Sequence, residues 1–179
     1  MLDTSQKHHT ALNLKKFIFC IPYEILLGHV VFKQGLMVYH AKIAVIVNLE
    51  APNTVKQLRA ILGHTENYRN FIELYAQITA PMGKLLKKGV TFCSDEDYQK
   101  ILDVLKKKMV ITPILVFPNW KKEFQVHVDA SCISLGFVLT QLGEGDIDYP
   151  IAFASRKLSK AEKNYSTTEC EDLEMVHSL

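Results

Sequence analysis

One carboxylate in this sequence stands where an acid can do chemistry from a rigid backbone. Apolar residues at alternate positions, Phe124, Val126 and Val128, form the period-two pattern of a half-buried strand. That strand runs into Asp129, a small-residue turn follows, and a second β-branched run reaches Thr140. The pattern predicts a β-hairpin with an acid at the end of its first strand. Such an acid is either a turn former or a metal ligand, and the pattern alone leaves both interpretations open.

A second group of acids lies near the end of the sequence. Glu169 and Glu171 begin a segment with helical spacing, and each has a structural explanation. Ser166 with Glu169, or Thr168 with Glu171, has the spacing of a helix capping box. Carboxylates from separate elements are also the hard oxygen ligands that Mg²⁺ prefers. Both glutamates are therefore candidates for either role.

These segments resemble the start of the RNase H domain in the Pol polyprotein of gypsy-type LTR retrotransposons. The likeness rests on Asp-Ala-Ser at 129–131 with the following Gly136 and Gln141, and on the segments 150–158 and 164–169. Upstream residues resemble the same polyprotein in the same order, so the likeness covers nearly the whole chain. It implies an RNase H-like mixed sheet of three strands and a helix.

The resemblance also implies a chemistry. RNase H-type hydrolysis of an RNA–DNA hybrid uses two divalent metals, Mg²⁺ or Mn²⁺, on either side of the scissile phosphate. Asp129 matches the first carboxylate of that site. The family pattern Thr-Thr-Glu-x-Glu makes Glu171 the second, so Asp129 and Glu171 are the expected catalytic and metal-binding residues.

Several features predict that the site is incomplete. Phe137, Asp172 and Glu174 replace two small residues and a leucine of the family pattern, as in a copy no longer held to catalytic geometry. The remaining RNase H acids do not appear before Leu179, and there is no Tyr-x-Asp-Asp polymerase sequence. We therefore predict neither RNase H nor polymerase activity from this polypeptide alone. The alternative function is a non-catalytic nucleic-acid-binding module.

The N-terminal part resembles the end of the reverse transcriptase palm. Two β-rich runs, Phe17–Ile21 and Ile25–Phe32, are predicted to pair across a turn at residues 22–23. Leu-Gly-His at 27–29 matches the hairpin that grips the primer strand, which makes Gly28 and His29 candidate nucleic-acid contacts. A residue without Cβ lets a backbone come close, but a β-bulge in an ordinary hairpin explains Gly28 equally.

The next region has helical spacing and resembles the thumb. A helix is predicted from Val55, capped by the turn at 51–54, and Pro81 suits the first turn of another helix. The resemblance makes Lys56, Arg59 and Arg69 candidate contacts to a template-primer duplex. Salt bridges on the helix surface are the alternative for each.

A lysine-rich connecting region follows. Residues 94–97 predict a helix cap at Ser94, the helix runs to Met109, and a proline-bracketed extended segment spans 112–118. The lysines of the middle of the chain form a band that can face a phosphate backbone, although solvated helix faces explain it as well: Lys84, Lys87, Lys88, Lys100, Lys106, Lys107, Lys108, Lys121 and Lys122.

The whole chain is predicted to be an α+β protein in four parts. These are a palm-end hairpin (1–38), a thumb-like helical region (39–89), a connecting helix and segment (90–122) and the start of an RNase H-like domain (123–179). The net charge of +2 is weak evidence for any partner, and no apolar run has the length of a membrane span. Four cysteines without paired spacing fit a reduced, intracellular protein. An exposed sheet edge makes self-association plausible.

Overall fold

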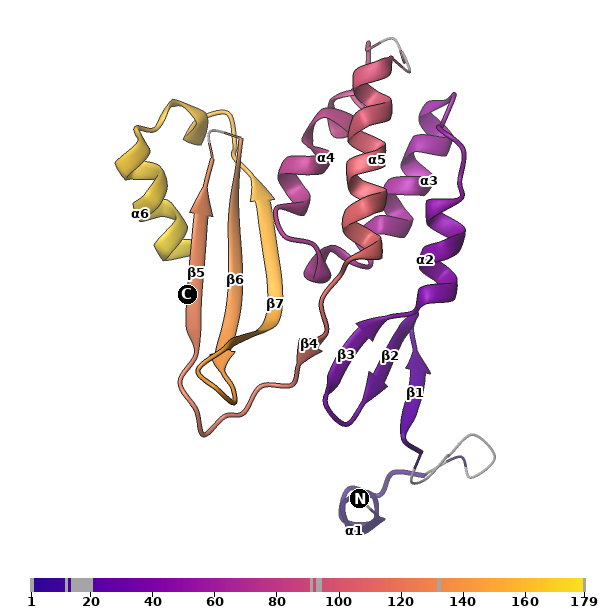
Figure 1. The fold of residues 1–179 in the computed structure, drawn as a ribbon, viewed down its shortest axis with the longest axis vertical. Helices are drawn as coiled ribbons and strands as arrows, with labels where there is room; N and C mark the ends of the chain where they lie inside the picture. Colours follow the sequence, from indigo (N-terminus) through magenta and orange to yellow (C-terminus); the bar gives the residue numbers. More distant parts are fainter. Residues whose placement is uncertain are drawn as a thin grey trace.

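The computed structural model describes residues 2–11, 13, 21–90, 92, 95–131 and 133–178. It confirms the α+β class, with two antiparallel sheets and a group of helices between them in sequence (Figure 1). A short helix, α1 (Leu2–Lys7), precedes the first sheet. Most of the predicted strand at 17–21 and the predicted cap Ser94 lie outside the described residues.

The first sheet has the strand order β1-β2-β3-β4. Its strands are β1 (Tyr23–Leu26), β2 (His29–Phe32), β3 (Gly35–Val38) and the short β4 (Leu115–Val116). The prediction of one run over Ile25–Phe32 is wrong, because the chain reverses between Leu26 and His29. Leu27 and Gly28 have φ angles of 51° and 86°, as a two-residue hairpin turn of type I′ requires. Gly28 is thus a turn residue and not a bulge.

Four helices surround one hydrophobic core: α2 (His40–Val47), α3 (Val55–Glu66), α4 (Tyr75–Lys84) and α5 (Glu96–Val110). The α3 cap falls in the predicted turn, where Thr54 Oγ1 accepts from the Gln57 N–H at 3.2 Å. Asp95 caps α5 by accepting from the Tyr98 N–H at 2.8 Å. Core side chains from all four helices are buried, among them Ile43, Leu58, Met82, Leu102 and Leu105.

The start of α4 differs from the sequence prediction. A single 3-10 turn, η1 (Arg69–Phe71), leads to Leu74, which precedes the helix with a left-handed backbone (φ 54°, ψ 30°). The helix begins at Tyr75, so Pro81 lies inside it and the prediction that Pro81 stands in the first turn is wrong. The helix starts early because a residue of the second sheet caps it, a contact that the local sequence does not reveal.

The second sheet has the order β5-β6-β7 and consists of β5 (Gln125–Ala130), β6 (Ser134–Leu142) and β7 (Asp148–Lys157). Its described strands are all antiparallel, where a mixed sheet was expected. After the 3-10 turn η2 (Glu162–Asn164), the helix α6 (Thr167–Ser178) lies beside β5, while α4 lies beside β7 (Figure 1). Within the described ranges, no helix is long and apolar enough to cross a membrane.

Candidate functional site

Asp129 lies on the face of the second sheet that points toward the helical region. In the β5–β6 ladder it stands directly opposite Gly136, and directly opposite residues of an antiparallel pair share a face. A Cβ added to Gly136 would meet the Leu74 side chain, so this face is the one against α4. Asp129 itself is exposed and lines a cavity of about 80 Å³ together with Glu73 and Leu74.

The helix that carries Glu171 packs against the other face. Phe137 is next to Gly136 in β6 and therefore points the opposite way. The His177 ring of α6 lies on Phe137, with ring centroids 6.0 Å apart. The strand register thus places Asp129 and the packed side of α6 on opposite faces of the sheet.

The two glutamates of α6 have different surroundings. Glu169 Oε2 accepts from the Ser166 N–H at 2.7 Å and from the Ser166 hydroxyl at 2.8 Å, and the Glu169 N–H donates back to that hydroxyl at 3.4 Å. These bonds form a capping box and hold the pKa of Glu169 below its ordinary value. Glu171 is exposed, and its side chain forms no hydrogen bond or ion pair with a described residue. The capping explanation therefore applies to Glu169 and leaves Glu171 available.

Domains of the RNase H-like kind generally use a divalent metal, so we asked whether the described side chains can hold one. Among the residues with described positions, no three His, Cys, Asp or Glu side chains gather closely enough to bind an ion. The register separates Asp129 from the packed side of α6. A shared site at Asp129 and Glu171 remains a prediction.

The predicted primer-grip residues are held by packing. The Tyr68 hydroxyl donates to the Gly28 carbonyl at 3.0 Å, and burial raises the pKa of Tyr68. The His29 ring lies against Tyr68 and Phe71, with ring centroids 5.3 Å and 5.4 Å away. Leu27, at the tip of the turn, is 87% exposed. The structure thus gives Gly28 and His29 roles in docking the hairpin, while the Leu27 side chain at the tip of the turn is exposed to solvent.

The outer face of α3 carries two of the predicted contacts. Lys56 and Arg59 are exposed, and neither has a partner among the described residues, whereas Leu58 and Ile61 on the opposite face are buried. The same outer face includes Gly63, where no described atom outside the adjacent residues and the backbone of the helix itself lies within 4 Å of where a Cβ would stand. Gly63 was not among the predicted contacts, although a glycine inside a helical pattern is a recognised signal.

Arg69 and much of the lysine band have partners inside the chain. Arg69 pairs with Glu66 at 2.9 Å, with both side chains more than half exposed. Lys100 pairs with Asp97 at 3.1 Å and Lys108 with Glu73 at 3.5 Å. Other lysines of the band bind backbone carbonyls, namely Lys106 at Leu49 and Lys122 at Leu142. The band is therefore not one continuous free cationic surface.

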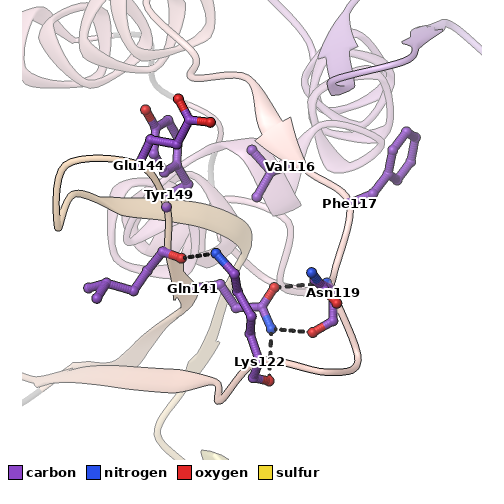
Figure 2. A pocket seen from close by; sticks show the side chains of 9 residues that line it. Val116, Phe117, Asn119, Lys122, Gln141, Glu144 and Tyr149 are labelled. Carbon is purple, nitrogen blue, oxygen red and sulfur yellow. Dashed lines mark hydrogen bonds between the residues drawn. The ribbon is translucent and has the colours of Figure 1, made fainter.

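A hollow of about 280 Å³ lies at the opposite end of the sheet from Asp129. Figure 2 shows the side chains that line it, among them Gln141, Asn119 and Lys122. Gln141 at its base is only 4% exposed, and its side-chain amide is fully bonded to the connecting segment. Gln141 Oε1 accepts from the Asn119 N–H at 2.8 Å, and Nε2 donates to the carbonyls of Asn119 at 2.9 Å and Lys122 at 3.2 Å. These bonds fasten the segment that enters β5, which is a structural role.

Known proteins are similar to this chain along its whole length. Residues 95–179 match the family described as "RNase H-like domain found in reverse transcriptase". The chain is 38% identical over 166 residues to the retrovirus-related Pol polyprotein from transposon 297 of Drosophila melanogaster, a match that covers 92% of this chain and 15% of that protein. It is 33% identical over 190 residues to the Pol polyprotein from transposon opus of the same organism, covering 100% of this chain and 19% of that protein.

A solved structure has the same fold. The foamy viral protease-reverse transcriptase in complex with RNA/DNA hybrid superposes with a TM-score of 0.76 and 22% sequence identity, over 92% of this chain and 22% of that chain. The present chain spans less than a fifth of the length of the two Drosophila relatives. The family match and the Pol relatives together identify the chain as a reverse transcriptase/RNase H-like segment of the retrotransposon Pol type, with its RNase H-like domain within residues 95–179.

Proposed function

We propose that this segment binds a nucleic-acid duplex, either an RNA–DNA hybrid or a template-primer, through the outer face of α3. The observation that carries the proposal is the composition of that face. Lys56 and Arg59 are cations without partners among the residues that the structure describes, and Gly63 beside them leaves the helix backbone uncovered. Glycine in a helix costs about 1 kcal/mol relative to alanine, and nothing inside the protein requires it here. Close approach of an external backbone accounts for its presence.

The ligand class is supported by charge and by fold. Unpaired cations on one helix face are the usual means of neutralising phosphates. The foamy viral enzyme of the same fold has been solved in complexes with RNA/DNA hybrid and with double-stranded DNA. The Leu27 side chain at the tip of the β1–β2 turn is exposed and offers a second candidate contact, and Tyr68, which follows α3 in the chain, holds that turn by donating to the Gly28 carbonyl.

Binding is tested by fluorescence anisotropy with a labelled RNA–DNA hybrid over a range of salt concentrations. We expect the logarithm of the association constant to fall linearly with the logarithm of the salt concentration. The slope should be about −0.9 for each phosphate neutralised. Replacing Lys56 and Arg59 by glutamine should reduce that slope by about 2. The matched control replaces Lys100 and Lys107, two exposed lysines of α5, and should leave the slope unchanged. Equal losses in both variants, or no binding at low salt, would contradict the proposal.

Catalysis by this polypeptide alone is not part of the proposed function. Two metals on a scissile phosphate need more carboxylates than Asp129 and Glu171, the two that match the family pattern. We therefore expect no cleavage of an RNA–DNA hybrid in the presence of Mg²⁺ or Mn²⁺. Cleavage that disappears in Asp129→Asn would overturn this expectation and establish Asp129 as a catalytic residue.

Self-association through the second sheet is a separate proposal. Within the described residues, β5 pairs on one side only, with β6. An unpaired strand edge is a template for pairing with another chain. Light scattering that shows a monomer at high concentration would exclude it.

A further inference from the structure

The end of β7 carries the segment Ala-Ser-Arg-Lys-Leu at 154–158, to which the duplex-binding proposal assigns no role. Its side chains alternate between the two faces of the sheet. Phe153, Ser155 and Lys157 point toward the helical region, and Arg156 points the other way. Ser155 and Lys157 contact α4, Phe153 packs against the helical core, and Arg156 contacts the loop that leads to α6.

Ser155 caps a helix that is distant in the sequence. Leu74, which precedes α4, offers no side-chain cap of its own. The Ala76 N–H in the first turn of α4 donates instead to Ser155 Oγ at 2.9 Å, across 79 positions of the chain. The first N–H groups of a helix have no partner inside the helix, so a hydroxyl in this position satisfies one of them.

Two more contacts extend this junction. Lys157 Nζ donates to the Thr79 carbonyl at 3.3 Å, and a Cβ on Gly83 would stand 2.7 Å from the same Nζ. Leu74 occupies the space left by the missing side chain of Gly136, directly opposite Asp129 in the β5–β6 ladder. The aromatic side chain of Phe153 packs against the helical core.

On the opposite face, Arg156 fixes the path to α6. Its guanidinium forms a two-point ion pair with Glu162, at 2.9 Å and 3.0 Å. Glu162 Oε2 also accepts from the Ser159 N–H at 2.7 Å. The loop between β7 and α6 is thereby tied to the same strand that caps α4.

We propose that the segment Ser155-Arg156-Lys157 is a two-sided clamp that joins the helical region, the sheet and the β7–α6 loop into one cooperative unit, with Ser155 as the residue that positions α4. The clamp makes the α3 face and the Asp129 strand parts of the same rigid body. This inference is independent of the duplex-binding proposal, since it concerns contacts within the chain.

Amide hydrogen exchange measured by NMR tests the clamp on the full chain. In Ser155→Ala the Ala76 amide should exchange at least about fivefold faster, because a lost helix cap changes an opening equilibrium by about that factor. Ser155→Thr, which keeps a hydroxyl, should restore slow exchange. Ser166→Ala is the matched control, because it removes the cap of α6 and should leave the Ala76 amide unchanged.

Cooperativity is read from the slowest amides of α5 and β6. In the wild type these should open with the same free energy, as members of one unit do. In the double variant Ser155→Ala with Lys157→Ala, the amides of α5 and those of β6 should open with different free energies. Identical exchange of Ala76 in the wild type and Ser155→Ala, or separate opening of α5 and β6 already in the wild type, would overturn the proposal.

A reciprocal size change tests the Leu74 contact. Gly136→Ala should lower the melting temperature or prevent folding, because its methyl group collides with Leu74. Adding Leu74→Ala should restore part of the loss, as residues in direct contact are coupled. A double variant no more stable than Gly136→Ala alone would contradict the fit of these two residues.

Discussion

Asp129 stands directly opposite Gly136 in the β5–β6 ladder, and the two residues share the face of the sheet that meets α4. The strand carrying the predicted first carboxylate is therefore supported by the helical region, through Leu74 at the start of α4. α6, with Glu171, packs against the other face through His177. The register therefore separates the predicted first carboxylate from the packed side of the helix that carries the predicted second one.

His29 should matter for stability more than for binding. Its ring packs on Tyr68 and Phe71, and such aromatic pairs contribute about 0.5–1.5 kcal/mol each beyond the area that they bury. We expect His29→Ala to lower the free energy of unfolding in urea by about 1–3 kcal/mol. Lys56→Ala, an exposed change, should stay within about 0.5 kcal/mol of the wild type. Unchanged stability with lost duplex affinity in His29→Ala would show that this ring contacts the ligand.

Gln141 should be the residue on which the entry into β5 depends. Gln141→Leu removes the partners of the Asn119 N–H and of the Asn119 and Lys122 carbonyls. Unpaired polar groups of this kind cost about 1–3 kcal/mol, so chemical denaturation should show a loss of that order. Gln99→Leu is the matched control, because among the described residues the Gln99 side chain bonds only to the exposed Asp103, at 3.1 Å. Equal stability of the two variants would contradict a structural role for the Gln141 amide.

Acid should loosen the link between β7 and α6. Hydrogen bonds from Arg156 and Ser159 lower the pKa of Glu162 from 4.5 to about 2. A carboxylate with a depressed folded-state pKa stabilises the fold fully above its unfolded pKa, and this contribution is lost as the pH falls from about 4.5 toward 2. The free energy of unfolding should therefore decline over this range, and Glu162→Gln should show a shallower decline. The same acid dependence in both proteins would place its origin elsewhere.

Sequence patterns predicted the elements whose signals are local. The helix through Tyr98 and Met109 and the hairpin whose first strand carries Asp129 both follow from periodicity, and both are present. The turn at Leu27 was missed because a leucine rarely adopts a positive φ. The start of α4 was missed because its cap, Ser155, belongs to another element.

The candidate site was only partly predictable for the same reason. Period-two alternation shows which residues share a face of a strand, but not which neighbour covers that face. It therefore could not show that Asp129 points toward Leu74 while α6 covers Phe137. Similarly, spacing proposed two capping boxes for α6, and only atomic positions assign the cap to Ser166 with Glu169.

The most direct test of duplex binding by α3 is the single substitution Gly63→Ala, with stability and hybrid affinity measured on the same protein. Apart from the adjacent residues and the backbone of its own helix, a methyl group at this position meets no described atom, so the helix should gain up to about 1 kcal/mol of stability. The same methyl group should weaken binding of an RNA–DNA hybrid, because it holds the ligand backbone away from the helix. The account predicts higher stability together with lower affinity, whereas higher stability with unchanged affinity would contradict it.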